Sequence, residues 1–390
     1  MIKFPALSLS FFATLILFLT TATALAQEPQ PKLPRRRTPR YIVKPSGTST
    51  APVPRNMAQS LTAHTIPLWS YHIVSPLDGK SYSGYMVGRS PFFHGQRTTT
   101  VQAYLVPVIL TFADTGSAFD PTTVDSCLGD SVDHVILQSP IFQNSTYIMN
   151  GADVGTTQYV DAFQRANFWS KVSPAGNSYH TRLQVRTAAA LKVTVPAANG
   201  ITNNLTFCGN DGELDINWWD NLVQTTILPS LASQGIGPTV LPIFVFDSVE
   251  MCDTGGCGIL GYHNAYFNSA GIMQTYSVAD FDNSGLYGGD VSVLSHEIGE
   301  WMDDPAVITT GNLTPAWGNT GQVSGCQTNL EVGDPLTGFD VAPVTLNGFT
   351  YTLQELAFFS WFFRQSPSLG AGGLFSNDGT FSTDAGLVCM

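Results

Sequence analysis

Residues 289–305 read Gly-Asp-Val-Ser-Val-Leu-Ser-His-Glu-Ile-Gly-Glu-Trp-Met-Asp-Asp-Pro, a stretch bounded by a helix-starting and a helix-breaking residue. Asp290 is a good N-cap residue and Pro305 cannot continue a helix, so the pattern predicts a helix of about four turns between them. At helical pitch His296 and Glu300 lie on one face, one turn apart, and Glu297 leans toward the same side. The stretch therefore carries the motif His-Glu-x-x-Glu on a single helix.

This layout matches the metalloprotease motif HExxH with its second histidine replaced by glutamate. In HExxH, two ligands one turn apart hold a metal and the intervening glutamate acts as a general base on the bound water. Carboxylates also bind Zn²⁺, so the motif predicts His296 and Glu300 as metal ligands and Glu297 as the catalytic residue. The alternative is that His296 packs or hydrogen-bonds in a core and both glutamates are solvated helix charges.

Two features favour the metal site over that alternative. Leu294, Ile298 and Trp301 form an apolar stripe on the other face of the predicted helix, so this helix should pack against a core. Only 12% of the chain is charged. A group of histidine, glutamate and aspartate side chains on a core-packed helix then needs partners, because buried carboxylates are costly unless they are paired or bound to metal.

The motif supplies two ligands, whereas a catalytic Zn²⁺ usually takes three protein ligands and a water. Glu331 is the first candidate for the third ligand, and Asp334 is its substitute. The alternative interpretation of both is an ordinary turn, because residues 333–335 read Gly-Asp-Pro. His263, in a stretch rich in Gly and Tyr, is a ligand, an oxyanion stabiliser or a structural histidine. The expected metal is Zn²⁺, with Mn²⁺ or Ca²⁺ as competitors for such hard ligands.

The N-terminus has the pattern of a secretory signal peptide. Lys3 precedes an apolar run at residues 11–19, and the small residues Ala24 and Ala26 predict cleavage after Ala26. No later stretch approaches the roughly 18 apolar residues that a membrane span needs. The chain is therefore expected to be secreted or periplasmic, with residues 1–26 as the signal peptide.

The remainder divides by composition. Residues 27–58 are rich in proline and arginine and predict an extended linker, with a pro-segment as the alternative. Residues 59–390 are expected to form the folded domain, either as one body or as a sheet-rich half at 59–240 and a metal-site half at 241–390. In residues 59–390, nine Lys and Arg stand against 28 Asp and Glu. So acidic a domain disfavours nucleic acid as a partner.

Six cysteines, an even number in a chain expected to be exported, predict disulfides. Cys252 and Cys257 flank four residues and could close a small loop. The pairing of the others stays open.

The predicted secondary structure mixes strands and helices. Enrichment in β-branched and aromatic residues predicts strands at 71–74, 101–112, 183–185, 191–195, 242–246 and 274–279. Helical spacing predicts helices at 156–169 and 216–232, the second capped by Asp215 and bent or ended early by Pro229. The fold class is therefore α+β, a mixed twisted sheet packed on the metal-site helix and carrying disulfides.

The helix sequence SHEIGEWMDDP, followed some 30 residues later by LEVGDP, resembles exported bacterial zincin-like proteins. Such proteins have a His-Glu-x-x-Glu helix ending in Asp-Pro and a Glu-x-x-Asp segment near a cysteine. The chain is also distantly similar to the plant exordium-like, phosphate-induced secreted proteins. The resemblance covers roughly residues 244–361. It implies a metallopeptidase-like fold with His296 and Glu300 as ligands, Glu297 as base, and the Glu331/Asp334 segment completing the site.

Two functions follow from this reading. The first is a secreted metal-dependent hydrolase, most simply a peptidase acting on a peptide or protein substrate. The second is a non-catalytic exported protein that keeps the zincin-like fold and binds a cell-surface or extracellular partner. A glycan-active enzyme with paired carboxylates is a third class, but the acidic residues show no spacing that supports it.

Overall fold

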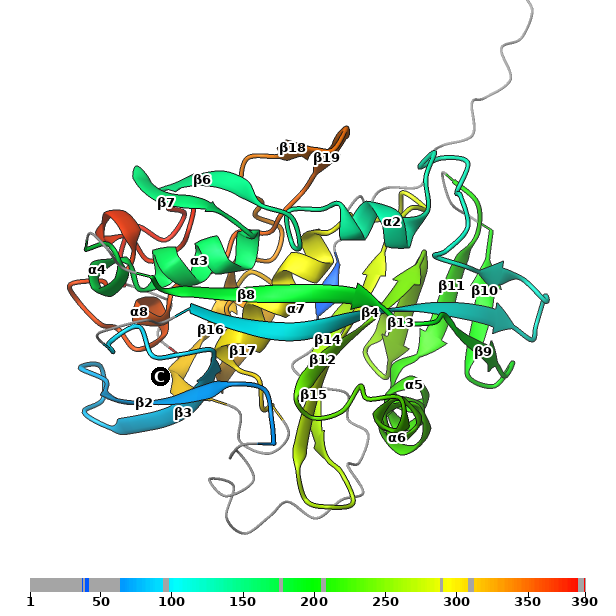
Figure 1. Ribbon diagram of the computed structural model, residues 1–390, viewed down its shortest axis with the longest axis horizontal. Helices are drawn as coiled ribbons and strands as arrows, with labels where there is room; N and C mark the ends of the chain where they lie inside the picture. Colours follow the sequence, from blue (N-terminus) through cyan, green and yellow to red (C-terminus); the bar gives the residue numbers. More distant parts are fainter. Residues whose placement is uncertain are drawn as a thin grey trace, which may run out of the picture. The chain divides into compact units, whose positions relative to one another are not determined.

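The architecture is a large mixed sheet with helices on both faces and four small two-stranded sheets around it (Figure 1). The computed structural model describes residues 37, 39–41, 64–93, 98–174, 178–204, 208–287, 290–307, 312–384 and 389. The predicted signal peptide and most of the predicted linker lie outside the described residues. Among the described residues, none of the helices has the length and apolarity that a membrane crossing requires.

Strands dominate the described chain. The strands are β1 (Arg40–Tyr41), β2 (Leu68–Val74), β3 (Ser81–Val87), β4 (Thr98–Phe112), β5 (Ala118–Phe119), β6 (Ser145–Met149), β7 (Ala152–Thr157), β8 (His180–Thr187), β9 (Leu191–Val195), β10 (Gly200–Asn203), β11 (Asp211–Asp215), β12 (Val240–Asp247), β13 (Val249–Asp253), β14 (Gly256–Phe267), β15 (Met273–Phe281), β16 (Leu313–Thr320), β17 (Val323–Asn329), β18 (Val344–Leu346) and β19 (Phe349–Tyr351). The helices are α2 (Val132–Leu137), α3 (Tyr159–Asn167), α4 (Trp169–Val172), α5 (Ile216–Leu222), α6 (Leu228–Ser233), α7 (Ser292–Asp303) and α8 (Phe359–Phe362), with the short turns η1 (Val223–Ile227), η2 (Asp334–Leu336) and η3 (Ala371–Gly373). The predicted strands and helices are all present, with shifted ends.

The main sheet has the order β10-β11-β13-β14-β15-β12-β4-β5, with β8 and β9 also paired to β4 and β1 paired to β14. Strand β12 runs parallel to both β4 and β15, whereas β14 runs antiparallel to β13 and β15. The sheet is therefore mixed, and the α+β fold class is confirmed. The strands that follow residue 240 lie together in this order, between β11 on one side and β4 on the other, so segments from before and after that residue share one sheet.

Strand β12 shows why both faces of the sheet are covered. Leu241, Ile243 and Val245 point into the core that contains α3 and α7, and Val240, Phe244 and Phe246 point into the core that contains α5 and α6. Side chains of a strand alternate between the two faces, so an unbroken apolar run requires an apolar layer on each side. Figure 1 shows α3 and α7 on one side of these strands and α5 and α6 on the other.

Helix α7 starts one residue later than the capping pattern predicts. Its N-cap is Val291, and no side chain caps the helix. The Asp290 carboxylate instead accepts hydrogen bonds from the backbone N–H groups of Val291 and Thr352, so the predicted role of Asp290 as N-cap is wrong. The other end agrees with the prediction, because the helix ends at Asp303, just before Pro305.

The helix predicted at 216–232 is confirmed, with an irregular middle. The Asp215 carboxylate accepts hydrogen bonds from the N–H groups of Asn217 and Trp218, as an N-cap should. A π-helical turn, η1, then joins α5 to α6, and Pro229 lies in the first turn of α6. A proline in a first turn breaks no hydrogen bond of that helix, so Pro229 is accommodated rather than disruptive.

All six cysteines form disulfides: Cys127–Cys208, Cys252–Cys257 and Cys326–Cys389. The small loop expected between Cys252 and Cys257 is confirmed. Three disulfides fit folding in an oxidising compartment outside the cytosol.

Candidate metal site

The candidate site lies where α7 packs on β14 and β15. The helix provides His296, Glu297 and Glu300, β14 provides His263, and the segment after β17 provides Glu331 and Asp334. None of these residues is more than 3% exposed. The predicted residues from the two distant sequence stretches thus come together inside the protein.

Close approach of α7 to β14 depends on a glycine. A side chain at Gly261 would place its first carbon 2.8 Å from Glu297 Cγ and 2.9 Å from Val293 Cγ1. The absence of a side chain at Gly261 therefore lets the helix bring Glu297 against the strand that carries His263. The apolar residues predicted to anchor α7 are all buried in the core behind it.

His296 has its tautomer set by a neighbouring amide. The Gln354 Nε2 group donates to the Gly333 carbonyl at 2.7 Å, which turns Gln354 Oε1 toward His296 Nδ1 at 3.0 Å. Because Oε1 can only accept, Nδ1 carries a proton, and Nε2 is the nitrogen that faces Glu300. Burial lowers the pKa of His296, but the charges of Glu300 and Asp334 and the hydrogen bonds of the ring together raise it more. The pKa of His296 therefore lies above its ordinary value, and a metal would take the place of the Nε2 proton. A histidine held in this way by an outer hydrogen bond is the usual arrangement of a metal ligand.

Glu300 is held on one oxygen and faces both histidines with the other. Its Oε1 accepts hydrogen bonds from the backbone N–H groups of Gly333 at 3.0 Å and Asp334 at 3.1 Å. Its Oε2 lies 3.1 Å from His296 Nε2 and 3.7 Å from His263 Nδ1. Burial alone would raise the pKa of Glu300, but the charge of His296 and its hydrogen bond to Glu300 outweigh it, and the pKa lies below its ordinary value.

His263 is the member of the site that the sequence left undecided. Its Nε2 lies 3.0 Å from the Asp304 carbonyl oxygen, which can only accept, so Nδ1 presents the lone pair. That Nδ1 lies 3.3 Å from Glu297 Oε2. Burial lowers the pKa of His263 to about 4, which keeps the ring neutral as a metal ligand requires.

Glu331 and Asp334 differ in the hydrogen bonds that their carboxylate oxygens accept. Asp334 accepts hydrogen bonds from the side chains of Gln322 and Gln327 and lies 3.7 Å from His296 Nε2. Glu331 faces His263 Nε2 at 3.8 Å, and no N–H or O–H group of another described residue reaches either of its oxygens. Burial, and then the charge of Glu300, raises the pKa of Glu331 well above its ordinary value. Of the two acids, Glu331 is the one that needs a partner.

The cluster suits a divalent cation by charge and by spacing. Among the described residues, no lysine or arginine forms an ion pair with any of its four acidic side chains. The ligand atoms of His263, Glu300 and Glu331 all lie within 4.8 Å of one another, and so do those of His296, Glu297 and Glu300. Two ligand atoms about 2.1 Å from a tetrahedral metal lie about 3.4 Å apart, close to the separations around Glu300 Oε2.

Gly333→Ala should destabilise the protein by about 1–3 kcal/mol, because the added carbon overpacks the core. That carbon would lie closest to the His296 ring and would displace its Nδ1 from Gln354. The backbone at Gly333 has φ of −87°, which alanine adopts freely, so the cost is steric. Denaturant unfolding measures it. Gly237→Ala is the control, since nothing lies within 4 Å of its added carbon, and equal losses in the two variants would contradict the prediction.

Comparison of the chain with protein-family models, with curated proteins and with solved structures finds no match. Only the geometry of this site and the motif it contains therefore point to a function.

Proposed function

We propose that the protein is an exported metal-dependent hydrolase that acts on peptide bonds, with a zincin-like arrangement of helix and sheet. The observation that supports it best is Glu300 Oε2, which faces both His296 Nε2 and His263 Nδ1 in a cluster whose acids pair with no described lysine or arginine. Zn²⁺ fits two imidazoles and two carboxylates, and Mn²⁺ is the competitor that carboxylate ligands favour. Ca²⁺ fits less well, because it prefers oxygen ligands.

The residues divide into ligands and a base. Three of the four residues His263, His296, Glu300 and Glu331 would hold the cation and leave a position for water. The cation would supply Lewis acidity to a carbonyl and to that attacking water. Glu297 Oε1 has no hydrogen-bond partner among the described residues, so it is the atom placed to take a proton from that water and return it to the leaving amine. In the metal-free chain, burial raises the pKa of Glu297 well above its ordinary value, and the charges of Glu300 and Asp334 raise it further. A nearby positive charge would favour its ionised form.

One observation favours the second candidate, an exported protein with a structural metal and no turnover. The site residues are almost completely buried, and a structural metal needs no access for substrate, whereas a catalytic metal does. The two candidates share the metal and differ in what Glu297 does.

Removal of the metal should lower the stability of the folded protein. A cation at about 100 times its dissociation constant stabilises the folded state by about 2.7 kcal/mol, and a chelator abolishes that term. Mass spectrometry of the intact protein should give one Zn²⁺ or Mn²⁺ per chain, and thermal unfolding with and without chelator should show the shift. His296→Ala should lose both effects.

The control for this experiment is His134→Ala, because His134 is an exposed histidine paired with Asp130 outside the site. It should retain the metal and the chelator-sensitive shift. The proposal would be overturned if the native protein binds no metal and its unfolding temperature does not change when Zn²⁺, Mn²⁺ or chelator is added.

A further inference from the structure

A short segment of the predicted linker lies directly on the candidate site. Strand β1 runs parallel to β14, with Arg40 opposite Ile259 and Tyr41 opposite Gly261. The backbone N–H of Tyr41 donates to Gln322 Oε1 at 2.6 Å. The segment is thus held by backbone pairing to the same strand that carries His263, in the way that an extended peptide adds to a sheet.

The Tyr41 side chain covers a candidate ligand. Its ring is stacked on the His296 imidazole with the ring centroids 3.7 Å apart and the planes 14° apart. Only 6% of Tyr41 is exposed. A substrate could reach this face of His296 only if Tyr41 moved.

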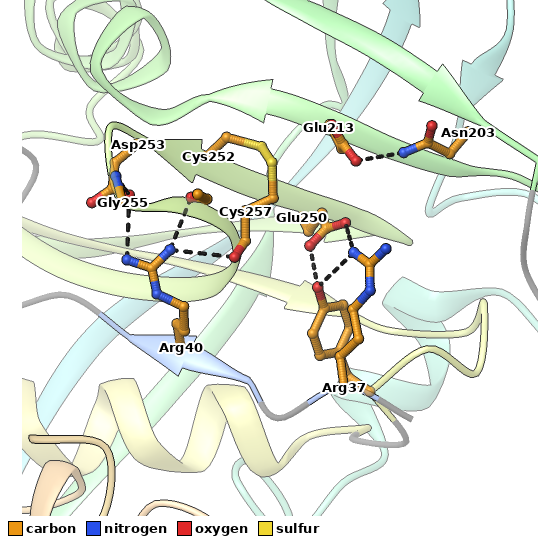
Figure 2. The surroundings of a disulfide bond; sticks show 11 residues. Arg37, Arg40, Asn203, Glu213, Glu250, Cys252, Asp253, Gly255 and Cys257 are labelled. Atoms are coloured by element: carbon orange, nitrogen blue, oxygen red, sulfur yellow. Dashed lines mark hydrogen bonds and ion pairs between the residues drawn. A yellow bond between two sulfur atoms is a disulfide. The ribbon is translucent and has the colours of Figure 1, made fainter. Parts of the chain in front are cut away.

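Two arginines precede the tyrosine in the chain and bind acidic or carbonyl groups (Figure 2). Arg37 Nη1 lies 2.7 Å from Oε1 of Glu250, a fully buried carboxylate. Arg40 Nη1 donates to the Gly256 carbonyl at 2.8 Å, and its Nη2 lies 3.3 Å from Asp253 Oδ1. Asp253 and Gly256 belong to the turn that the Cys252–Cys257 disulfide closes. Arg40 therefore binds a turn that a covalent bond holds in place.

We infer that residues Arg37 and Pro39–Tyr41 occupy the peptide-binding path of the site and inhibit it, as a tethered mimic of the substrate. The inference deepens the proposed function, on which it rests, and it names the substrate class. Preferred substrates are extended peptides with an aromatic side chain over His296 and arginines toward Glu250 and Asp253. The strongly acidic body of the protein would attract such basic peptides.

The contacts of the segment suit a reversible inhibitor. Only two residues pair with β14. The Arg40–Asp253 ion pair joins side chains that are 36% and 27% exposed, and such partly exposed pairs are weak. Tethering compensates for this weakness, because it gives the segment an effective concentration on the order of millimolar at its own site.

The test measures binding of a peptide in trans, in the full-length chain. The probe is the fluorescently labelled, end-blocked peptide Arg-Thr-Pro-Arg-Tyr, the sequence of residues 37–41. The variant carries Arg37→Ala, Arg40→Ala and Tyr41→Ala together, in a Glu297→Gln background that prevents cleavage. Fluorescence anisotropy should show binding to this variant at least about tenfold tighter than to Glu297→Gln alone, because the tethered competitor is gone. The same peptide with alanine in place of its tyrosine should bind at least about tenfold more weakly.

Matched variants keep the result interpretable. Lys80→Ala, in the Glu297→Gln background, removes an ion pair with Asp78 elsewhere and should leave peptide binding unchanged. Arg40→Ala alone keeps the buried Tyr41 ring and should bind the peptide with an affinity between those of the triple variant and the Glu297→Gln protein. The inference can then still be tested if the triple variant does not fold. Equal peptide affinity in the Arg40→Ala variant, the triple variant and the Glu297→Gln protein would overturn the inference. Metal content and peptide turnover of the native protein are measured separately. A failure of the proposed hydrolase function is thereby distinguished from a failure of the inferred inhibition by residues 37–41.

Discussion

Glu297→Gln should lower peptide hydrolysis by about 10²–10⁴-fold, the usual contribution of a positioned general base. Glutamine keeps the volume and the burial of the side chain but cannot accept the proton at Oε1. The helix and the candidate ligands should remain in place, because Glu300 keeps its hydrogen bonds to Gly333 and Asp334, and His296 keeps its bond to Gln354. Metal content and unfolding midpoint should therefore match those of the native protein. Peptide turnover by the purified protein, with metal analysis of the same samples, measures the effect.

The control for this variant is Glu213→Gln, which changes a partly buried glutamate of β11 that binds Asn203 away from the site. It should hydrolyse peptides at the native rate. If native protein and Glu297→Gln hold metal equally and neither hydrolyses peptides, the metal is structural and the second candidate function holds. If Glu297→Gln loses the metal, Glu297 is a ligand rather than the base.

Trp301→Ala should destabilise the fold by about 3–5 kcal/mol, the range for truncation of a large buried aromatic side chain. Trp301 is fully buried on α7, and its Nε1–H donates to Thr275 Oγ1 on β15 at 3.0 Å. The substitution leaves a cavity and an unpaired Thr275 hydroxyl between the site helix and the sheet. Because α7 carries three of the site residues, metal affinity should fall together with stability. Urea unfolding and metal titration of the same variant measure the two effects.

Trp169→Ala is the matched control, since Trp169 is only partly buried and lies on the separate helix α4. Its loss of stability should be smaller, and its metal affinity should stay native. Trp301→Phe, which refills most of the cavity, should recover part of the stability. A loss of less than about 1 kcal/mol in Trp301→Ala would mean that α7 is held by other contacts.

The local part of the site was predictable because helical geometry acts over a few residues. Two side chains four apart on a helix must lie near each other, and His296 Nε2 and Glu300 Oε2 are 3.1 Å apart. The apolar stripe that includes Trp301 likewise predicted which face meets the core. Capping was less predictable. Asp290 is a good capping residue by type, but its carboxylate turns to the Thr352 backbone, a competitor far away in the sequence.

The amino-acid sequence by itself determined the α+β class, most strands and helices, the helix carrying His-Glu-x-x-Glu and the disulfide between Cys252 and Cys257. These depend on periodicity and short spacing, which act between neighbours along the chain. Only the tertiary structure decided that His263 faces Glu300, that Glu331 lies beside His263 with no donor among the described residues, and that Tyr41 covers His296. Those contacts join segments far apart in sequence, and they result from the packing of α7, β14, β1 and the segment after β17, which no single stretch of sequence specifies.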